Sequence, residues 1–182
     1  GTTQTKAGFS KGDGWTFVGD GNYNIASGKV DDNIDKANAT INVTPYDVTY
    51  DGNAHTAGGT ATGVKAEDLS SLLTLSGTTH TNAGFYLLDA WNFVGNGNYN
   101  NAGGFVIDHI AKANAVIHVT GYTGMYDAAA HGASGTAVGV ESPTPVDLNS
   151  LLHLGASFTN ALGGTAHWTF DGNDNYNSAN GN

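Results

Sequence analysis

Short stretches of alternating apolar and polar residues predict β-strands along this chain. Residues 39–44 and 115–120 both alternate with a period of two, which is the spacing of side chains on one face of a strand. A further stretch places Trp91 and Phe93 on one face in the same way. Helical periodicity is limited to residues 68–73 and 147–152, where we expect the leading aspartate to cap a single turn. The pattern therefore predicts an all-β chain.

Turn-forming dipeptides separate the predicted strands. They are Asp20-Gly21, Asp51-Gly52, Asn96-Gly97 and Asp171-Gly172. Asn-Gly and Asp-Gly supply the positive φ angles that tight hairpins need. We therefore expect short hairpin connections at these positions.

The same motifs recur along the chain at a nearly constant offset. Residues 35–39 return at 111–115, and residues 21–24 return at 97–100, both at an offset of 76. Further on, the offset changes to 79 and then to 77, because loops gain and lose residues. Such a period predicts a tandem array in which each repeat is one folding unit.

The repeat divides the chain into three predicted modules. Residues 1–38 form the C-terminal half of a first module, residues 39–114 a complete one, and residues 115–182 a third that lacks its last strand. About 76 residues in roughly five to seven short strands fit a small sandwich of two antiparallel sheets. The expected fold class is tandem β-sandwich modules of about 76 residues.

The recurring motifs resemble a known family of bacterial surface repeats. The stretch 39–56, with Tyr46, Tyr50-Asp51-Gly52 and His55, is followed by residues 77–86, 91–99 and 110–115 in the order and spacing of MBG domain repeats. The resemblance covers essentially the whole chain. It implies Ig-like sandwiches strung in long arrays on large, secreted, adhesin-like bacterial proteins, and it supplies no catalytic or ligand residue.

Composition excludes several classes of function. The chain has a net charge of -10, six Lys+Arg residues that are all lysine, and no cysteine. Without arginine or a basic patch, binding to nucleic acid or to an anionic membrane is not expected. The absence of cysteine excludes disulfides, thiolate metal sites and a cysteine nucleophile. No apolar run approaches the length of a membrane span, and residues 1–20 do not have the shape of a signal peptide.

Oxygen-bearing side chains in the glycine-rich loops are weak candidates for a calcium site, since Ca²⁺ prefers hard oxygen ligands. They are Asp20, Asn22, Asp171, Asn173 and Asp174. The middle repeat has Asn96 in place of Asp20, and no EF-hand frame is present. We favour solvated turn residues over calcium, and we expect no other cofactor.

Recurring aromatic and histidine residues have a structural and a functional interpretation. Trp15, Trp91 and Trp168 are each followed by a phenylalanine two residues later, so we favour core packing over a sugar-binding platform. For the tyrosines at 23, 99 and 176 we favour packing or turn-locking, and for His55 and His131 turn stabilisation over metal binding.

Catalytic residues are not predicted. The chain contains no nucleophile elbow, no P-loop and no complete dinucleotide fingerprint. Glu67 and Glu141 lie in equivalent variable loops and do not form a glycosidase pair. An isopeptide crosslink would need a buried lysine beside its partner and an acid, whereas Lys36 and Lys112 lie at module junctions.

The sequence as a whole predicts a structural and interaction protein rather than an enzyme. We expect a segment of a long extracellular protein of the bacterial cell surface, serving as the stalk or fibre of an adhesin or filament. The expected partners are neighbouring modules, other subunits that pair with open edge strands, and an unidentified surface ligand. A carbohydrate-binding module and a calcium-stiffened adhesin are the alternatives.

Overall fold

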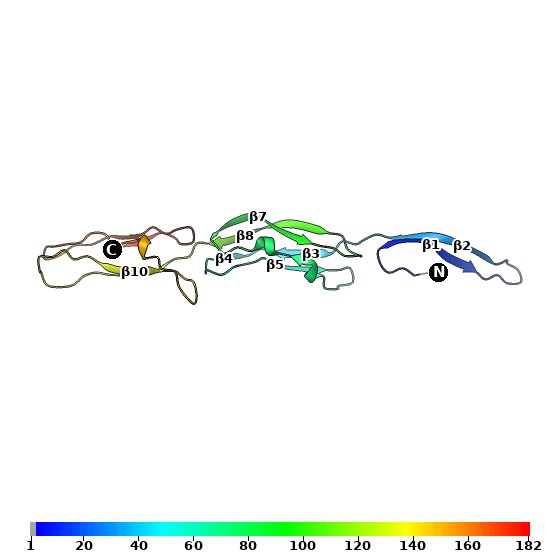
Figure 1. Cartoon of the computed structure of the whole chain (residues 1–182), viewed down its shortest axis with the longest axis horizontal. Coiled ribbons are helices and arrows are strands. Elements are labelled where there is room, and N and C mark those ends of the chain that lie inside the picture. The colour runs from blue at the N-terminus through cyan, green and yellow to red at the C-terminus, as the bar shows by residue number, and fades with distance from the viewer. Residues whose placement is uncertain (1–2) are drawn as a thin grey trace. The chain divides into compact units, whose positions relative to one another are not determined.

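The chain is an all-β protein in the computed structural model, which describes residues 3–182 (Figure 1). It divides into two compact units. Unit 1 contains the described residues up to Thr44, Gly58–Gly77 and Ala90–Val106, and unit 2 contains Pro45–Ala57, Thr78–Asp89 and Ile107–Asn182. All five boundaries, at 44/45, 57/58, 77/78, 89/90 and 106/107, fall inside the middle repeat, so each unit combines part of that repeat with an adjoining one. No helix of the described residues has the length and apolar character needed to cross a membrane.

Unit 1 is built from two antiparallel strand pairs and short turns. Strand β1 (Gly8–Phe17) pairs with β2 (Ala26–Ile34), with a register shift between Ser10 and Asp13. Strand β3 (Thr40–Thr44) pairs with β5 (Gly58–Thr62). A 3-10 turn, η1 (Ser70–Leu72), leads into β6 (Leu73–Thr74). It is followed by η2 (Ser76–Thr78), whose last residue belongs to unit 2.

Unit 2 contains the strands of the third repeat. Strand β9 (Val116–Thr120) pairs with β10 (Ser134–Val138), and after η3 (Asn149–Leu151) a sheet forms from β11 (Leu152–His153), β12 (Trp168–Phe170) and β13 (Ala179–Gly181). Strand β4 (Asp47–Thr49) also belongs to this unit.

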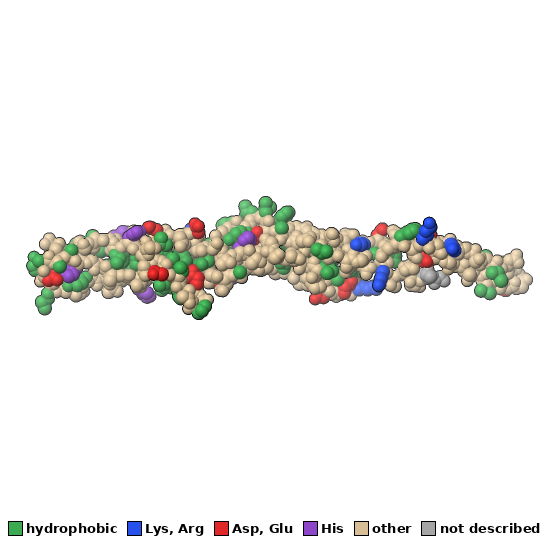
Figure 2. Space-filling model, viewed as in Figure 1, with side chains coloured by type: hydrophobic (Ala, Val, Ile, Leu, Met, Phe, Trp, Pro, Cys, Tyr) green, Lys and Arg blue, Asp and Glu red, His purple; other side chains and the backbone are tan. Residues whose placement is uncertain are grey.

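Two long strands of the middle repeat contribute residues to both units. They are β7 (Gly84–Phe93) and β8 (Ala102–Ala111), and they form the centre of a sheet with the order β4-β8-β7-β6. Strand β4 pairs with β8 in parallel, with Val48 opposite Ile110. Figure 2 shows hydrophobic side chains gathered on the surface over β7, where Phe85, Leu87 and Leu88 are exposed.

The sequence repeat is matched by a repeat in local structure. Ile41 lies opposite Ala61 in the β3–β5 pair, and Ile117 lies opposite Ala137 in the β9–β10 pair. The predicted helical segments are single 3-10 turns. The aspartate does not occupy the cap position itself: residue 69 or 148, a leucine, stands there. Asp68 Oδ1 instead accepts the Ser70 amide at 2.8 Å, in a turn that precedes the cap.

Equivalent residues of the repeat form the core of each unit. The shared positions are Ala61, Leu69, Phe93 and Tyr99 in unit 1, and Ala137, Leu148, Phe170 and Tyr176 in unit 2. Trp91 and Trp168 are partly buried against these cores, as the predicted core packing requires. For the first copy that prediction is wrong, because Trp15 and Phe17 are 42% and 49% exposed. Within residues 3–182, no further strand pairs with β1 or β2.

The prediction of tight hairpins is wrong: loops of eight residues (18–25, 94–101 and 171–178) join β1 to β2, β7 to β8 and β12 to β13, and β4 and β5 lie in different sheets. Gly52 and Gly172 have positive φ angles of 82° and 70°, but Gly21 and Gly97 do not. Between β7 and β8 the chain forms a loop in which Asn96 Oδ1 accepts the amides of Asn98 at 2.8 Å and Tyr99 at 3.2 Å. The side chain of Asn96 therefore closes this turn, and a positive φ at the following glycine is not needed.

Candidate functional site: the junction between repeats

Each junction joins the linker of one repeat to a turn of the next. The linker motif is Lys-Ala-Asn (residues 36–38 and 112–114), and the turn motif is Asn-Tyr-Asn (residues 98–100 and 175–177). In unit 1, the Ala37 amide donates to Asn98 O and the Asn100 amide donates to Ala37 O, both at 2.9 Å. The linker thus adds a short parallel β-bridge to the turn.

Unit 2 repeats this backbone arrangement at the next junction. The Ala113 amide donates to Asn175 O, and the Asn177 amide donates to Ala113 O, again at 2.9 Å. Ala113 is buried, with 3% of its surface exposed. Buried backbone groups need partners, and here the partners come from the neighbouring repeat.

Side chains of the linker and turn motifs reinforce the bridge. Lys36 Nζ donates to Asn96 O at 2.7 Å in unit 1, and Lys112 Nζ donates to Asn173 O at the same distance in unit 2. The last asparagine of each turn motif also donates through Nδ2 to the side-chain oxygen of the linker asparagine, at 2.9 Å. These lysines therefore bind turn carbonyls at the junctions.

A further bond links the residue directly before β1 or β7 to the turn motif of the next repeat. The Asn98 Oδ1 atom accepts the Ala7 amide at 2.9 Å, and Asn175 Oδ1 accepts the Ala83 amide at 2.9 Å. Ala7 and Ala83 are separated by the repeat offset. Because the same donors and acceptors recur, the two junctions have the same hydrogen-bonding geometry.

The tyrosine of the turn motif is fixed by a glutamate of its own repeat. Tyr176 donates to Glu141 Oε1 at 2.6 Å and accepts the Val140 amide at 3.0 Å. Tyr99 makes the corresponding bonds to Glu67 and to the Val64 amide. Gly63 and Gly139 border these hydroxyls, where a Cβ would overlap the tyrosine oxygen.

In unit 2 the glutamate also binds a tyrosine of the preceding repeat. Tyr50 donates to Glu141 Oε1 at 2.9 Å, and its ring meets that of Tyr176 edge to face, with centroids 5.5 Å apart. Gly52 lies beside this contact, where a Cβ would stand 2.6 Å from Glu141 Cγ. The Asp51-Gly52 turn therefore needs glycine both for its positive φ and for this close approach.

Burial and hydrogen bonding act in opposite directions on the pKa of Glu141. Burial alone raises it, but hydrogen bonds from Tyr176, the Val146 amide and Tyr50 bring the pKa below its ordinary value. Burial and the bond to this carboxylate raise the pKa of Tyr50 and of Tyr176. At neutral pH the junction therefore holds a charged carboxylate between two neutral phenols.

A second polar cluster lies in unit 2, within the middle repeat. His80 Nε2 lies 2.9 Å from both carboxylate oxygens of Asp89, and Asp108 Oδ1 accepts the Tyr46 amide at 2.9 Å. Burial, followed by the proximity of Asp89, raises the pKa of the fully buried Asp108 carboxyl. Burial is also the main cause that raises the pKa of Tyr46 to about 12.

The recurring histidines stabilise turns, as predicted from the sequence. His55 Nε2 lies 3.0 Å from Asp51 Oδ1, and His131 Nε2 lies 2.8 Å from Asp127 Oδ1. Hydrogen bonds from Asn53, first through its backbone, lower the pKa of Asp51 to about 2. Each histidine, which itself lies in an isolated β-bridge, thus bonds to the aspartate of the preceding turn.

The weak calcium candidates belong to turns. Asp20 Oδ1 accepts the amides of Asn22 and Tyr23, at 2.8 and 3.1 Å. Asn173 Oδ1 accepts the amides of Asn175 and Tyr176, at 2.9 and 3.0 Å. Asp171 binds His153 at 2.9 Å, and Asp174 is exposed. Over residues 3–182, no group of three or more His, Asp or Glu side chains is arranged to hold a metal ion.

Four residues of the junctions have roles that the sequence pattern does not predict. Glu67 and Glu141 are predicted only as loop residues, and Lys36 and Lys112 only as residues at module junctions. Both pairs recur at nearly the same offset as the tyrosines of the turn motif, which is the signal that the sequence offers. Comparison with known protein families, curated proteins and solved structures finds no match to this chain.

Proposed function

We propose that the chain is a structural and interaction segment of a long extracellular protein of the bacterial cell surface, in which Ig-like β-sandwich modules of about 76 residues form a stalk or fibre. The observation that carries this proposal is the repeated junction. Two successive linkers make the same backbone and side-chain hydrogen bonds to the following turn. A flexible tether between modules would not need a junction whose hydrogen bonds recur in the same geometry.

The junction accounts for two of the six lysines of the chain. Lys36 and Lys112 bind turn carbonyls, and the chain as a whole has a net charge of -10. Like charge keeps parallel chains apart in solution. The MBG resemblance of the motifs agrees with this proposal, because such repeats occur in long surface arrays.

The carbohydrate-binding alternative has less support. A sugar platform needs exposed aromatic faces, but Trp91 packs on its unit's core, and a Cβ added at Gly104 would lie only 2.7 Å from its indole. The calcium-stiffened alternative predicts a melting temperature that falls on chelation. We propose instead that EDTA leaves the melting temperature unchanged.

Electron microscopy of the native material, labelled with antibodies against this chain, tests the proposed function. The expected result is label along continuous thin stalks or fibres at the cell surface. Label confined to isolated particles in the medium, or to the cell interior, contradicts the proposal.

A further inference from the structure

The loop after β7 contains an exposed Asn-Gly dipeptide, residues 96–97, which lies in unit 1. Asn96 Oδ1 accepts the amides of Asn98 at 2.8 Å and Tyr99 at 3.2 Å. Over residues 3–182, neither Asn96 Nδ2 nor the Gly97 amide takes part in a hydrogen bond. A Cβ at Gly97 would meet nothing within 4 Å. The side-chain amide and the backbone nitrogen that follows it are therefore both free to react.

Lys36 contacts the peptide group that joins these two residues. Its Nζ donates to Asn96 O at 2.7 Å, and this oxygen belongs to the same peptide group as the Gly97 nitrogen. When the Gly97 amide loses its proton, the negative charge is shared between that nitrogen and Asn96 O. The ammonium of Lys36 stabilises this anion, because a donor already in place lowers the free energy of a charge that develops beside it. The Gly97 nitrogen thereby becomes a better nucleophile.

We propose that Asn96 is a site of spontaneous deamidation, in which Lys36 activates the Gly97 nitrogen. The Gly97 amide loses its proton, its nitrogen bonds to Asn96 Cγ, and the bond between Cγ and Nδ2 breaks. Nδ2 takes up a proton and leaves as ammonia, and water then opens the cyclic imide to aspartate or isoaspartate. The charge that develops on Oδ1 during ring closure meets the Asn98 and Tyr99 amides, which already donate to this oxygen. This inference goes beyond the proposed function and does not depend on it.

The other two repeats have the same turn, each with one residue changed. In the third repeat, Asn173 Oδ1 accepts two amides and Lys112 Nζ donates to Asn173 O at 2.7 Å, but Asp174 follows in place of glycine. A side chain on the residue that supplies the nucleophile hinders its approach to Cγ. In the first repeat, Asp20 stands at the position of Asn96, and its Oδ1 accepts two amides at 2.8 and 3.1 Å. The turn therefore accommodates aspartate, which is one of the two products.

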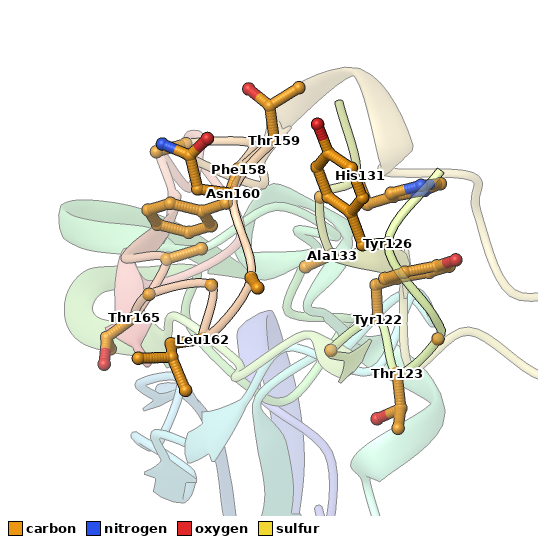
Figure 3. A pocket seen from close by; sticks show the side chains of 18 of the residues that line it. Tyr122, Thr123, Tyr126, His131, Ala133, Phe158, Thr159, Asn160, Leu162 and Thr165 are labelled. Carbon is orange, nitrogen blue, oxygen red and sulfur yellow. The ribbon is translucent and has the colours of Figure 1, made fainter. Parts of the chain in front are cut away.

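Two further asparagines lack one of these features. Asn160, labelled in Figure 3 on the wall of a pocket in the third repeat, is exposed but precedes Ala161, whose methyl group hinders the same attack. Asn180 precedes Gly181, but both lie in β13, where Gly181 pairs with Trp168. Strand pairing restrains the backbone there. We therefore expect both asparagines to react more slowly than Asn96.

Deamidation changes the charge of one junction and leaves the other as it is. Either product places a carboxylate next to Lys36, which binds the backbone carbonyl of residue 96. Aspartate preserves the turn, as Asp20 shows, whereas isoaspartate adds a carbon atom to the main chain of the turn. The junction that contains Lys112 keeps a neutral asparagine at residue 173. The two junctions thus become chemically different as the protein ages.

Peptide mapping by mass spectrometry tests the proposal on the folded chain, incubated at pH 8 in water enriched in heavy oxygen. We expect labelled acid to form at residue 96 at least about tenfold faster than at residue 173, because glycine places no side chain at the attacking nitrogen. We also expect residue 96 to react at least as fast as it does in a synthetic peptide of residues 92–101. Equal rates at residues 96 and 173, or a folded chain slower than the peptide, overturns the proposal.

Variants of the two lysines and of the following residue assign the roles. Lys36→Gln should slow the reaction at residue 96 several-fold, Lys36→Arg should retain most of the rate, and Lys11→Gln, at an exposed lysine of β1, should not change it. Amide shifts of residues 98 and 99 show whether the turn persists. A natural rate in Lys36→Gln with the turn intact overturns the proposal.

A gain of reactivity in the third repeat provides a test that does not depend on the folding of the Lys36 variants. Asp174→Gly gives Asn173 the same following residue as Asn96, beside Lys112. We expect residue 173 of this variant to deamidate at a rate close to that of residue 96, and several-fold more slowly when Lys112→Gln is added. If Asp174→Gly leaves residue 173 as an amide while residue 96 reacts, the turn and its lysine do not activate asparagine and the proposal is wrong.

Discussion

Tyr50 donates a hydrogen bond to Glu141, which lies 91 residues further along the chain and in the next repeat. Glu141 already accepts a bond from Tyr176 of its own repeat. The Glu141 carboxylate therefore joins Tyr176, which belongs to the turn motif of the third repeat, to Tyr50 of the middle repeat. Stability within the third repeat and attachment to the middle repeat are linked through this side chain.

Removing the Tyr50 hydroxyl tests that link. Tyr50→Phe should lower the free energy of unfolding by about 1 to 2 kcal/mol, because a hydrogen bond to a charged acceptor is lost in a largely buried site. Chemical denaturation measures the change. The matched control is Tyr126→Phe at the equivalent, exposed position of the third repeat, for which we expect no measurable change. Equal losses in both variants would show that the Glu141 contact is unimportant.

Because Glu141 is charged at neutral pH, the free energy of unfolding should depend on pH in the acid range. Its pKa in the folded state is lowered, so its contribution is present above the unfolded-state pKa, near about 4.3, and is lost as the pH falls through the folded-state value. Glu141→Gln should therefore reduce stability at pH 7 and make stability less sensitive to pH below about 5. Denaturation curves between pH 7 and 3 measure both effects. A variant with an unchanged acid profile contradicts the assignment.

Asp108 should behave in the opposite way, because burial and Asp89 raise its pKa in the folded state. The stability that protonation contributes is fully present below the unfolded-state pKa, near about 3.9, and is lost as the pH rises through the folded-state value. Asp108→Asn keeps an acceptor for the Tyr46 amide and needs no proton. We expect the variant to be more stable than the natural chain at pH 7 and to lose that advantage in acid.

The matched control for this prediction is Asp47→Asn. The Asp47 side chain is 83% exposed and lies 2.8 Å from His109 Nδ1. Thermal unfolding at pH 7 should show little change for this exposed substitution. If Asp108→Asn is destabilising at pH 7, the buried carboxyl is charged in the folded state and its assigned shift is wrong.

Gly104 on β8 lies against the indole of Trp91 on β7, and a substitution at this glycine tests how closely the two pack. A Cβ at Gly104 would lie 2.7 Å from Trp91 Cζ2, whereas nothing lies within 4 Å of a Cβ at Gly97. Gly104→Ala should therefore cost about 1 to 3 kcal/mol through overpacking, and Gly97→Ala should change stability by less than about 0.5 kcal/mol. Urea denaturation followed by tryptophan fluorescence measures both. Similar values for the two variants contradict the close packing of the indole.

Much of the architecture follows from local patterns. Alternation identified β3 and β9, and the repeat offset paired residues that occupy equivalent core positions, such as Phe93 and Phe170. The Trp15 prediction was wrong because burial of one strand face depends on a covering sheet. A period-two pattern shows which residues share a face, but it contains no information on what lies opposite that face.

The junction was harder to predict because its bonds connect residues far apart in the chain. The lysine of the linker binds a backbone carbonyl about 60 residues away, and any residue type supplies such an acceptor. The turn at Asn96 was misassigned for a related reason. The Asn-Gly dipeptide is compatible with a hairpin, but here the asparagine oxygen binds the two amides ahead of it and a longer loop results.

The central claim is that the linker and turn motifs hold consecutive repeats in one fixed geometry. Residual dipolar couplings of backbone amides test it within unit 2, with residues 84–89 and 107–111 on one side of the junction and residues 134–138 and 168–170 on the other. The account predicts that a single alignment tensor fits both groups in the natural chain. It also predicts that the two groups require different alignment tensors in the Tyr50→Phe, Asn177→Ala double variant. Two different tensors in the natural chain would contradict the claim.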